Sequence, residues 1–243
     1  MHDLRALIFD VFGTLVDWRS GVAREARAAL GKSIDGEAFA DAWRAEYQPT
    51  MALVRSGSIP FSKLDVLHRR NLDRVLKDCG RDDLPEAARA NLNLAWHRLD
   101  AWPDVGAALA RLRQRYRMAP CSNGNISLMA DLARRNGWHW DAILGAELAR
   151  DYKPKLEVYR AACDAFDCAP HEVLMVAAHS SDLEAAARAG LRTAFIARPD
   201  EQGPGRGEMR ASVAVEFSAA DLGALADSAN ADKNRSGAKK KKS

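Results

Sequence analysis

Short apolar runs that alternate with amphipathic helical patterns constrain the fold of this chain more than any other sequence feature. Apolar runs of strand length occur at residues 4–9, 116–121, 142–144 and 173–178, and the last of them at residues 193–197. Helical periodicity occupies the segments between them, at residues 104–115, 126–136, 156–166 and 182–189. Strands that alternate with helices are typical of a parallel sheet with helices on both faces. We therefore predict an α/β fold with a Rossmann-like, doubly wound parallel sheet as its core.

One long segment after the first strand contains only helical patterns. Phe39, Trp43 and Tyr47 recur every fourth residue, and two further apolar stripes follow at helical spacing. Apolar residues three and four positions apart predict amphipathic helices that bury one face. A chain of 243 residues is long enough for a core and one smaller accessory unit. The predicted domains are a core of residues 1–17 and 101–226 and an inserted helical cap domain of residues 18–100.

The distribution of charge argues against a nucleic-acid surface. The formal net charge is +3 at pH 7, but a lysine-rich stretch after residue 227 carries the positive excess and leaves the rest of the chain mildly acidic. A mildly acidic body lacks the basic face that nucleic-acid binding requires. We predict that residues 227–243 form a basic, disordered tail, with a polyanion-binding arm as the alternative.

The apolar runs are too short for a membrane protein. None approaches the ~20 residues that span a bilayer, and the N-terminus lacks the pattern of a secretory signal peptide. The four cysteines form no Cys-x-x-Cys pair and, with the histidines, no cluster of zinc-ligand spacing. These features predict a cytoplasmic protein with free thiols and no membrane partner.

Polar residues that follow the predicted strands are the candidates for chemistry. In a doubly wound sheet, ligands bind beyond the carboxyl ends of the strands, so side chains from distant segments meet there. The candidates are Asp10, Thr14, Ser122, Asn123, Lys153, His179 and Asp182. A carboxylate such as that of Asp10 can act as a covalent nucleophile. A positive charge on Lys153 would lower the pKa of Asp10 and keep it ionised.

Four short motifs, in this order, resemble those of the haloacid dehalogenase superfamily. They are Phe9-Asp10-Val11-Phe12-Gly13-Thr14-Leu15, Ser122-Asn123-Gly124, Tyr152-Lys153-Pro154 and Ala178-His179-Ser180-Ser181-Asp182. The resemblance covers nearly the whole chain apart from the basic tail. It implies a hydrolase in which Asp10 is the nucleophile.

Two departures from the phosphatases of this superfamily indicate the subfamily. Those phosphatases carry a second Asp two residues after the nucleophile, where this chain has Phe12, which cannot exchange a proton. They also bind Mg²⁺ through an acid at the position of Ala178, whose side chain offers no oxygen to a hard cation. With these two residues the chain is similar to the 2-haloacid dehalogenases, which implies catalysis without a metal or another cofactor.

The resemblance to 2-haloacid dehalogenases implies a two-step reaction on a short 2-haloalkanoic acid, such as a haloacetate or an (S)-2-haloacid. Asp10 displaces the halide and forms an ester, and water then hydrolyses the ester to give the 2-hydroxyacid. The implied catalytic residues are Asp10, Lys153, Asp182, Thr14 and His179. The implied substrate- and halide-binding residues are Arg44, Ser122, Asn123, Tyr159 and Phe12, with Arg44 receiving the halide ion.

The sequence leaves several alternatives open. Asp182 is the favoured base for activating water, and His179 is the second candidate because imidazole titrates near neutrality. An atypical phosphatase and a non-catalytic protein of the same fold are the alternative functions. The preferred halogen, including whether a C–F bond is cleaved, stays open. Members of the family are often homodimers, so a homodimer is an expectation here.

Overall fold

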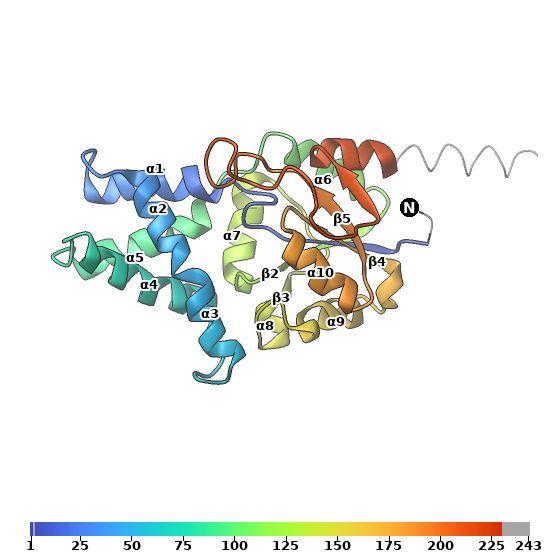
Figure 1. Cartoon of the computed structure of the whole chain (residues 1–243), viewed down its shortest axis with the longest axis horizontal. Helices are drawn as coiled ribbons and strands as arrows, with labels where there is room; N and C mark the ends of the chain where they lie inside the picture. The colour runs from blue at the N-terminus through green and yellow to red at the C-terminus, as the bar shows by residue number, and fades with distance from the viewer. Residues whose placement is uncertain (2, 230–243) are drawn as a thin grey trace, which may run out of the picture.

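The sheet at the centre of the core has six parallel strands in the order β3-β2-β1-β4-β5-β6 (Figure 1). The structure is a computed structural model and describes residue 1 and residues 3–229. The strands are β1 (Ala6–Phe9), β2 (Arg117–Ser122), β3 (Leu144–Gly145), β4 (Val173–Ala177), β5 (Arg192–Ile196) and β6 (Phe217–Ala219). This order is that of a doubly wound Rossmann-type sheet, so the predicted fold class is confirmed.

Helices cover both faces of the sheet, because the side chains of β1 alternate between two apolar clusters. Leu7 and Phe9 pack with α6, α7 and a helical stretch at residues 222–229. Ala6 and Ile8 pack on the opposite face with α9 and α10. The helices of the core are α6 (Val105–Leu112), α7 (Ile126–Asn136), α8 (Ala146–Ala149), α9 (Leu156–Ala165), the short 3-10 helix η2 (Pro170–Glu172) and α10 (Ser180–Arg188). All four residues of β1 are buried, as expected for a central parallel strand.

The boundaries of the strands and helices that were predicted agree with the observed ones to within three residues, and those of α7 agree at both ends, whereas α8 and η2 were not predicted. The strand predicted at residues 193–197 is present as β5, but the prediction that it is the last strand is wrong, because β6 follows it. This strand has three residues and pairs only with β5 at the edge of the sheet. None of its residues is fully buried, and the apolar residues that lead into it at 213–217 were not interpreted as a strand.

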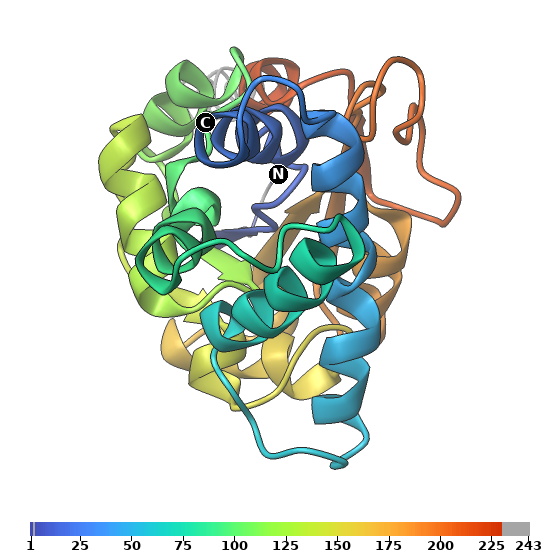
Figure 2. The same ribbon diagram turned by 90° about the vertical axis from the view of Figure 1, so that its left-hand side faces the viewer.

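Every element between residues 18 and 98 is a helix, as the sequence predicts for the inserted segment. These elements are α1 (Trp18–Leu30), α2 (Gly36–Ala45), α3 (Tyr47–Arg55), α4 (Leu64–Asp78), α5 (Glu86–Asn93) and the 3-10 helix η1 (Leu94–Arg98). Figure 2 looks onto this helical insert, with the core behind it. Aromatic side chains join the two parts, because the ring of Trp96 lies 5.7 Å from that of Phe12 and 5.5 Å from that of Trp43. A division into separate core and cap domains stays a prediction.

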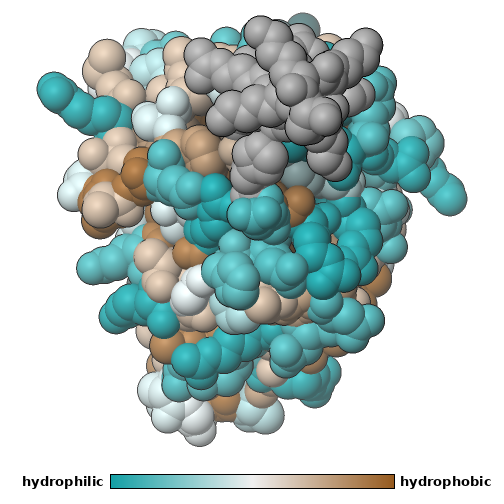
Figure 3. All heavy atoms as spheres, turned by 90° about the vertical axis from the view of Figure 1, so that its right-hand side faces the viewer, coloured by the Kyte–Doolittle hydropathy of each residue, from teal (hydrophilic) through white to brown (hydrophobic). Residues whose placement is uncertain are grey.

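The end of the chain is only partly described. Of the predicted basic tail, residues 227–229 continue the last helix and Ala229 is buried, whereas residues 230–243 lie outside the described residues. Where the structure describes the chain, no helix is long and apolar enough to cross a membrane. The face of the core that points away from the helical insert carries mostly hydrophilic side chains with scattered apolar ones (Figure 3).

Candidate active site

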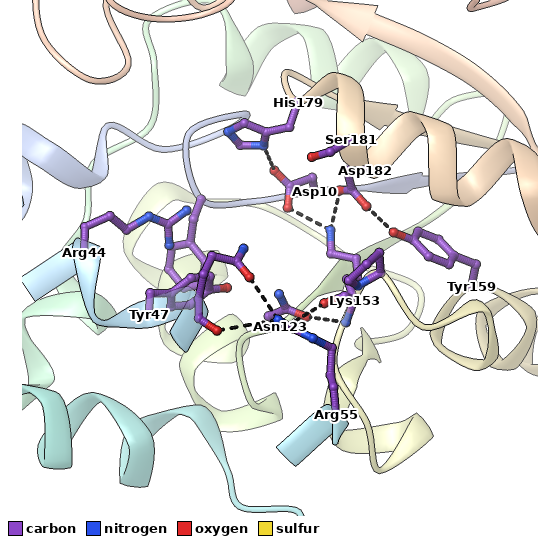
Figure 4. A pocket seen from close by; sticks show the side chains of 13 residues that line it. Asp10, Arg44, Tyr47, Arg55, Asn123, Lys153, Tyr159, His179, Ser181 and Asp182 are labelled. Atoms are coloured by element: carbon purple, nitrogen blue, oxygen red, sulfur yellow. Dashed lines mark hydrogen bonds and ion pairs between the residues drawn. The ribbon is translucent and has the colours of Figure 1, made fainter. Parts of the chain in front are cut away.

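A cavity of about 390 Å³ lies where the chain leaves β1 and β4, and helices α2 and α3 line its other side. The strand order reverses between β1 and β4, and doubly wound folds bind ligands at this switch point. The predicted site residues Asp10, Phe12, Arg44, Asn123, Lys153, Tyr159, His179 and Asp182 line the cavity (Figure 4). The other two predicted residues, Thr14 and Ser122, lie behind this lining and are fully buried.

An ion pair between Asp10 and Lys153 occupies the centre of the site. The ammonium of Lys153 lies 2.9 Å from Oδ1 of Asp10 and 2.5 Å from Oδ2 of Asp182, and all three side chains are buried. Burial by itself would raise the pKa of Asp10, but the charges of Lys153 and His179 outweigh it and hold the pKa well below its usual range. Burial would lower the pKa of Lys153, but the two carboxylates raise it. Asp10 is therefore ionised at neutral pH.

The second oxygen of Asp10 is held from two sides. Oδ2 accepts a hydrogen bond from the hydroxyl of Thr14 at 2.7 Å and lies 3.1 Å from Nδ1 of His179. The backbone amide of Ala178 donates to the Thr14 hydroxyl at 2.9 Å, which directs its proton to Asp10. Thr14 thus contacts Asp10 without contacting the cavity. Together with Lys153, these contacts fix the orientation of the carboxylate.

Both oxygens of Asp182 are engaged by protein donors. Lys153 donates to one, and the hydroxyl of Tyr159 donates to the other. Burial and the charge of Asp10 raise the pKa of Asp182, while Lys153 lowers it. The residue lies in the first turn of α10, where the helix dipole stabilises negative charge.

His179 forms a dyad with an acid that the sequence analysis missed. Nε2 of His179 lies 2.9 Å from Oε2 of Glu201, and the other oxygen of this buried carboxylate accepts from Nε1 of Trp18 at 3.0 Å. Burial would lower the pKa of His179, but its contacts with Asp10 and Glu201 raise it to about 10. The signal that could have found Glu201 is its place shortly after β5, at the same edge of the sheet.

The guanidinium of Arg44 lines the cavity and has a nitrogen without a hydrogen-bond partner in the described part of the chain. Its guanidinium lies 4.1 Å from the ring centre of Tyr47 and 5.3 Å from that of Trp18. One nitrogen, Nη1, is buried and has no hydrogen-bond partner within the described part of the chain. A buried N–H donor without an acceptor is costly unless a ligand satisfies it, so this group can receive an anion.

The turn after β2 positions Lys153 rather than Asp10. Oδ1 of Asn123 accepts from the backbone amide of Lys153 at 2.9 Å. The hydroxyl of Ser122 accepts from the amide of Gly124 at 3.1 Å, which closes the turn.

Burial raises the pKa of the neighbouring Cys121 to about 12, so this thiol stays protonated and is not a nucleophile.

The donor set does not suit a divalent cation. Across residues 1 and 3–229, no group of three His, Cys, Asp or Glu side chains is arranged to hold a metal ion. The carboxylates of Asp10 and Asp182 already pair with the ammonium of Lys153, which supplies their positive partner. Ala178 provides only backbone at the position where the phosphatases have an acid. We therefore derive no step through Mg²⁺.

The buried ion pair of Asp10 and Lys153 lies at the switch point of a Rossmann-type sheet, where α/β enzymes bind their substrates. The fold and the site therefore place this protein in the class of α/β enzymes. The haloacid dehalogenase-like hydrolase family model matches residues 4–190. The chain is 32% identical to (S)-2-haloacid dehalogenase 4A of Burkholderia cepacia, over 82% of this chain and 85% of that protein.

Two solved structures are more similar in sequence. The defluorinating L-2-haloacid dehalogenase Rha0230 is 42% identical with a TM-score of 0.89, over 93% of this chain and 94% of that one. The L-2-haloacid dehalogenase PA0810 is 43% identical with a TM-score of 0.88, over 93% of this chain and 99% of that one. The chain therefore belongs to the haloacid dehalogenase-like hydrolase family, and within it to the (S)-2-haloacid dehalogenases.

Proposed function

We propose that this protein hydrolyses short 2-haloalkanoic acids, including haloacetates and (S)-2-haloacids, to 2-hydroxyacids through an ester on Asp10. The observation that carries the proposal is the buried Asp10 carboxylate, which Lys153 keeps ionised and three side chains hold at the wall of a cavity. A relative that is 32% identical is named (S)-2-haloacid dehalogenase 4A.

In the first step, an oxygen of Asp10 attacks the carbon that bears the halogen. The new C–O bond forms as the C–X bond breaks, and the halide leaves with the electron pair of that bond. Arg44 provides the positive charge and the free N–H that receive the halide. These interactions strengthen only as the halide develops its charge, so they stabilise the transition state more than the substrate.

In the second step, water attacks the carboxyl carbon of the Asp10 ester. Asp182 is poorly suited to act as the base, because Lys153 and Tyr159 already donate to its two oxygens. We assign the base to His179, with Glu201 as the residue that orients it. The ester no longer carries the charge of Asp10, which removes one of the two carboxylates that raise the pKa of His179. His179 can then lose its proton, accept one from water and release the hydroxyacid as Asp10 is restored.

The halogen range is proposed to include fluorine. The relative Rha0230, which is 42% identical, is described as defluorinating. Fluoride is a small, strong hydrogen-bond acceptor, and the buried Nη1 of Arg44 has a donor to offer it. Fluoride release from fluoroacetate measures this property.

The family resemblance also predicts a homodimer in the cytoplasm, and sedimentation of the full chain measures the oligomeric state.

Labelled water tests the covalent mechanism. A single turnover with chloroacetate in H₂¹⁸O, with EDTA present, should place ¹⁸O in Asp10, as peptide mass spectrometry would show. Asp10→Asn should abolish halide release and leave the circular dichroism spectrum unchanged. Halide release by that variant at the wild-type rate, or label in the product but never in Asp10, would contradict the proposal. Phosphate release that requires Mg²⁺ would instead indicate the phosphatase.

A further inference from the structure

The outer part of the active-site cavity has a polar lining that the proposed reaction does not use. This outer wall is formed by Gln48 and Arg55 of α3 and by Ser181 of α10. Gln48 and Ser181 are exposed, and Arg55 is half-buried. In Figure 4, Arg55 lies beside Asn123 and Lys153, on the side of the site away from His179. None of the described residues that line the cavity is Leu, Ile, Val or Met.

A wall of this kind discriminates between longer substrates by their polarity. Small-molecule sites are lined mainly by apolar side chains, which gain free energy when they take an alkyl chain out of water. The outer wall of Gln48, Arg55 and Ser181 offers no aliphatic or aromatic side chain, so an alkyl group that reaches this wall gains little. A polar or charged group at the far end of the substrate would keep favourable partners in this wall.

Arg55 is the charged group of this outer wall, and its present partners are all neutral oxygens. It donates to the backbone carbonyl of Lys153 at 3.1 Å and to the backbone and side-chain oxygens of Gln48 at 3.5 and 3.4 Å. In the described part of the chain it forms no ion pair with a carboxylate. A guanidinium has five N–H donors and pairs with a carboxylate through two of them, so Arg55 retains capacity for an anion.

Lys153 sets the separation between Arg55 and the reacting carbon. Its ammonium contacts Asp10 at 2.9 Å, while its carbonyl oxygen accepts from Arg55. The Asp10 carboxylate and the Arg55 guanidinium are therefore separated by at most one lysine residue with a hydrogen bond at each end. A substrate whose reacting carbon lies against Asp10 can extend one or two further carbons towards Arg55.

We propose that the substrates of this enzyme include 2-halodicarboxylic acids of the size of 2-halosuccinate, whose distal carboxylate binds Arg55. This inference rests on the proposed function and specifies its substrate class. The chemistry is the same displacement. Asp10 bonds to the carbon that bears the halogen, halide leaves with the C–X electron pair, and water then releases 2-hydroxysuccinate and a proton.

Halide release from matched substrates tests the role of Arg55. Both enantiomers of 2-chlorosuccinate and of 2-chlorobutyrate, which have carbon chains of equal length, are compared by kcat/KM. The wild type should prefer chlorosuccinate. Arg55→Met should lower the ratio of the two kcat/KM values at least tenfold, mainly through KM, because binding remote from the reacting bond is lost. Arg55→Lys should retain part of the preference, and added salt should reduce the wild-type ratio.

Arg70→Met is the matched control, because it removes one exposed cation from α4 of the same helical insert. It should leave the ratio unchanged. A wild-type ratio below one, or an unchanged ratio in Arg55→Met, overturns the inference. An equal loss on both substrates would mean that Arg55 acts only by holding Lys153, and it overturns the inference as well.

A binding measurement separates this inference from the proposed function. If no haloacid releases halide, the proposed function fails, but calorimetry with 2-hydroxysuccinate and 2-hydroxybutyrate still reports on Arg55. Tighter binding of 2-hydroxysuccinate that Arg55→Met removes supports the anion site. Equal binding of the two hydroxyacids overturns it.

Discussion

At the scale of single residues, the site is organised by alternating charges. The carboxylates of Asp10, Asp182 and Glu201 alternate with the cations of Lys153 and His179, and each buried charge contacts an opposite one. Buried charges persist in proteins when they are paired and hydrogen-bonded in this way. The pairing keeps Asp10 ionised, which a nucleophile needs. In the proposed reaction, it also holds the proton on His179 until the ester removes the charge of Asp10.

Replacing His179 should separate the two chemical steps. We expect His179→Asn to release one equivalent of halide and then to stall, with ester hydrolysis slowed about 10²–10⁴-fold, because the base is lost. Intact-protein mass spectrometry should detect the accumulated ester on Asp10. Asp182→Asn is the comparison, and accumulation of ester in that variant alone would return the role of base to Asp182.

The pH dependence of kcat should report the pKa of His179 in the ester state. Only the neutral imidazole accepts a proton, so kcat should rise with pH, and the midpoint should lie below the value of about 10 in the free enzyme. Glu201→Gln removes a carboxylate that raises this pKa, so the midpoint should shift to lower pH. A midpoint that stays in place, or that moves to higher pH, would mean that Glu201 does not act on the titrating group.

At the scale of secondary-structure elements, the contact between β2 and β3 positions the second motif. Gly145 ends β3 with φ 118°, a conformation that residues with a Cβ rarely adopt. A Cβ at this position would collide with the backbone of Ser122 at the end of β2. The glycine therefore allows β3 to approach the turn that carries Asn123, and Asn123 in turn holds the backbone of Lys153.

Gly145→Ala should consequently destabilise the fold and impair the site. We expect a loss of roughly 2–4 kcal/mol in the free energy of unfolding, from backbone strain and overpacking. Urea titration followed by circular dichroism measures this loss. Gly106→Ala is the matched control, because Gly106 lies in α6 with open space around its Cβ position. That variant should gain up to about 1 kcal/mol, and a similar gain in Gly145→Ala would disprove the argument.

At the scale of the whole molecule, a polar contact supplements the apolar one between the helical insert and the core. The ring of His97 in η1 lies 2.8 Å from Oδ2 of Asp131 in α7 and 3.1 Å from Oδ1 of Asp65 in α4. Asn125, which precedes α7, donates to the other oxygen of Asp65 at 2.8 Å. Burial would lower the pKa of His97, but the two carboxylates raise it.

This contact should make the stability of the whole molecule depend on pH. Because the folded-state pKa of His97 is raised, its stabilisation is fully present below the unfolded value of about 6.5 and is lost as pH rises through the folded value. His97→Gln should therefore lower the free energy of unfolding by about 1 kcal/mol at pH 5.5 and by less at pH 9. The effect is small because solvent screens the exposed carboxylate of Asp131. Urea titrations at both values measure the difference. The exposed His139→Gln is the control, and an equal cost at both pH values would contradict the prediction.

The sequence alone determined the fold class and most residues of the candidate active site. Apolar runs and helical periodicity are local, so they identify strands such as β1 and the helix α7 without tertiary information. The carboxyl-edge rule then groups Asp10, Lys153 and His179, because parallel strands bring their carboxyl ends together. The short edge strand β6 and Glu201 were both missed, although Glu201 follows β5 at the same edge of the sheet.

Only the tertiary structure decided which atoms meet. Glu201 contacts His179, and Arg55 contacts Lys153, across sequence separations for which no periodicity exists. Ser122 has the right place in its motif, yet its hydroxyl accepts from a turn amide and does not line the cavity. A pattern reports which face a residue lies on, whereas the direction of each hydrogen bond depends on packing between distant segments. That is why the fold and the pairing of Asp10 with Lys153 could be predicted from the sequence, whereas the contacts of Glu201 and Arg55 could not.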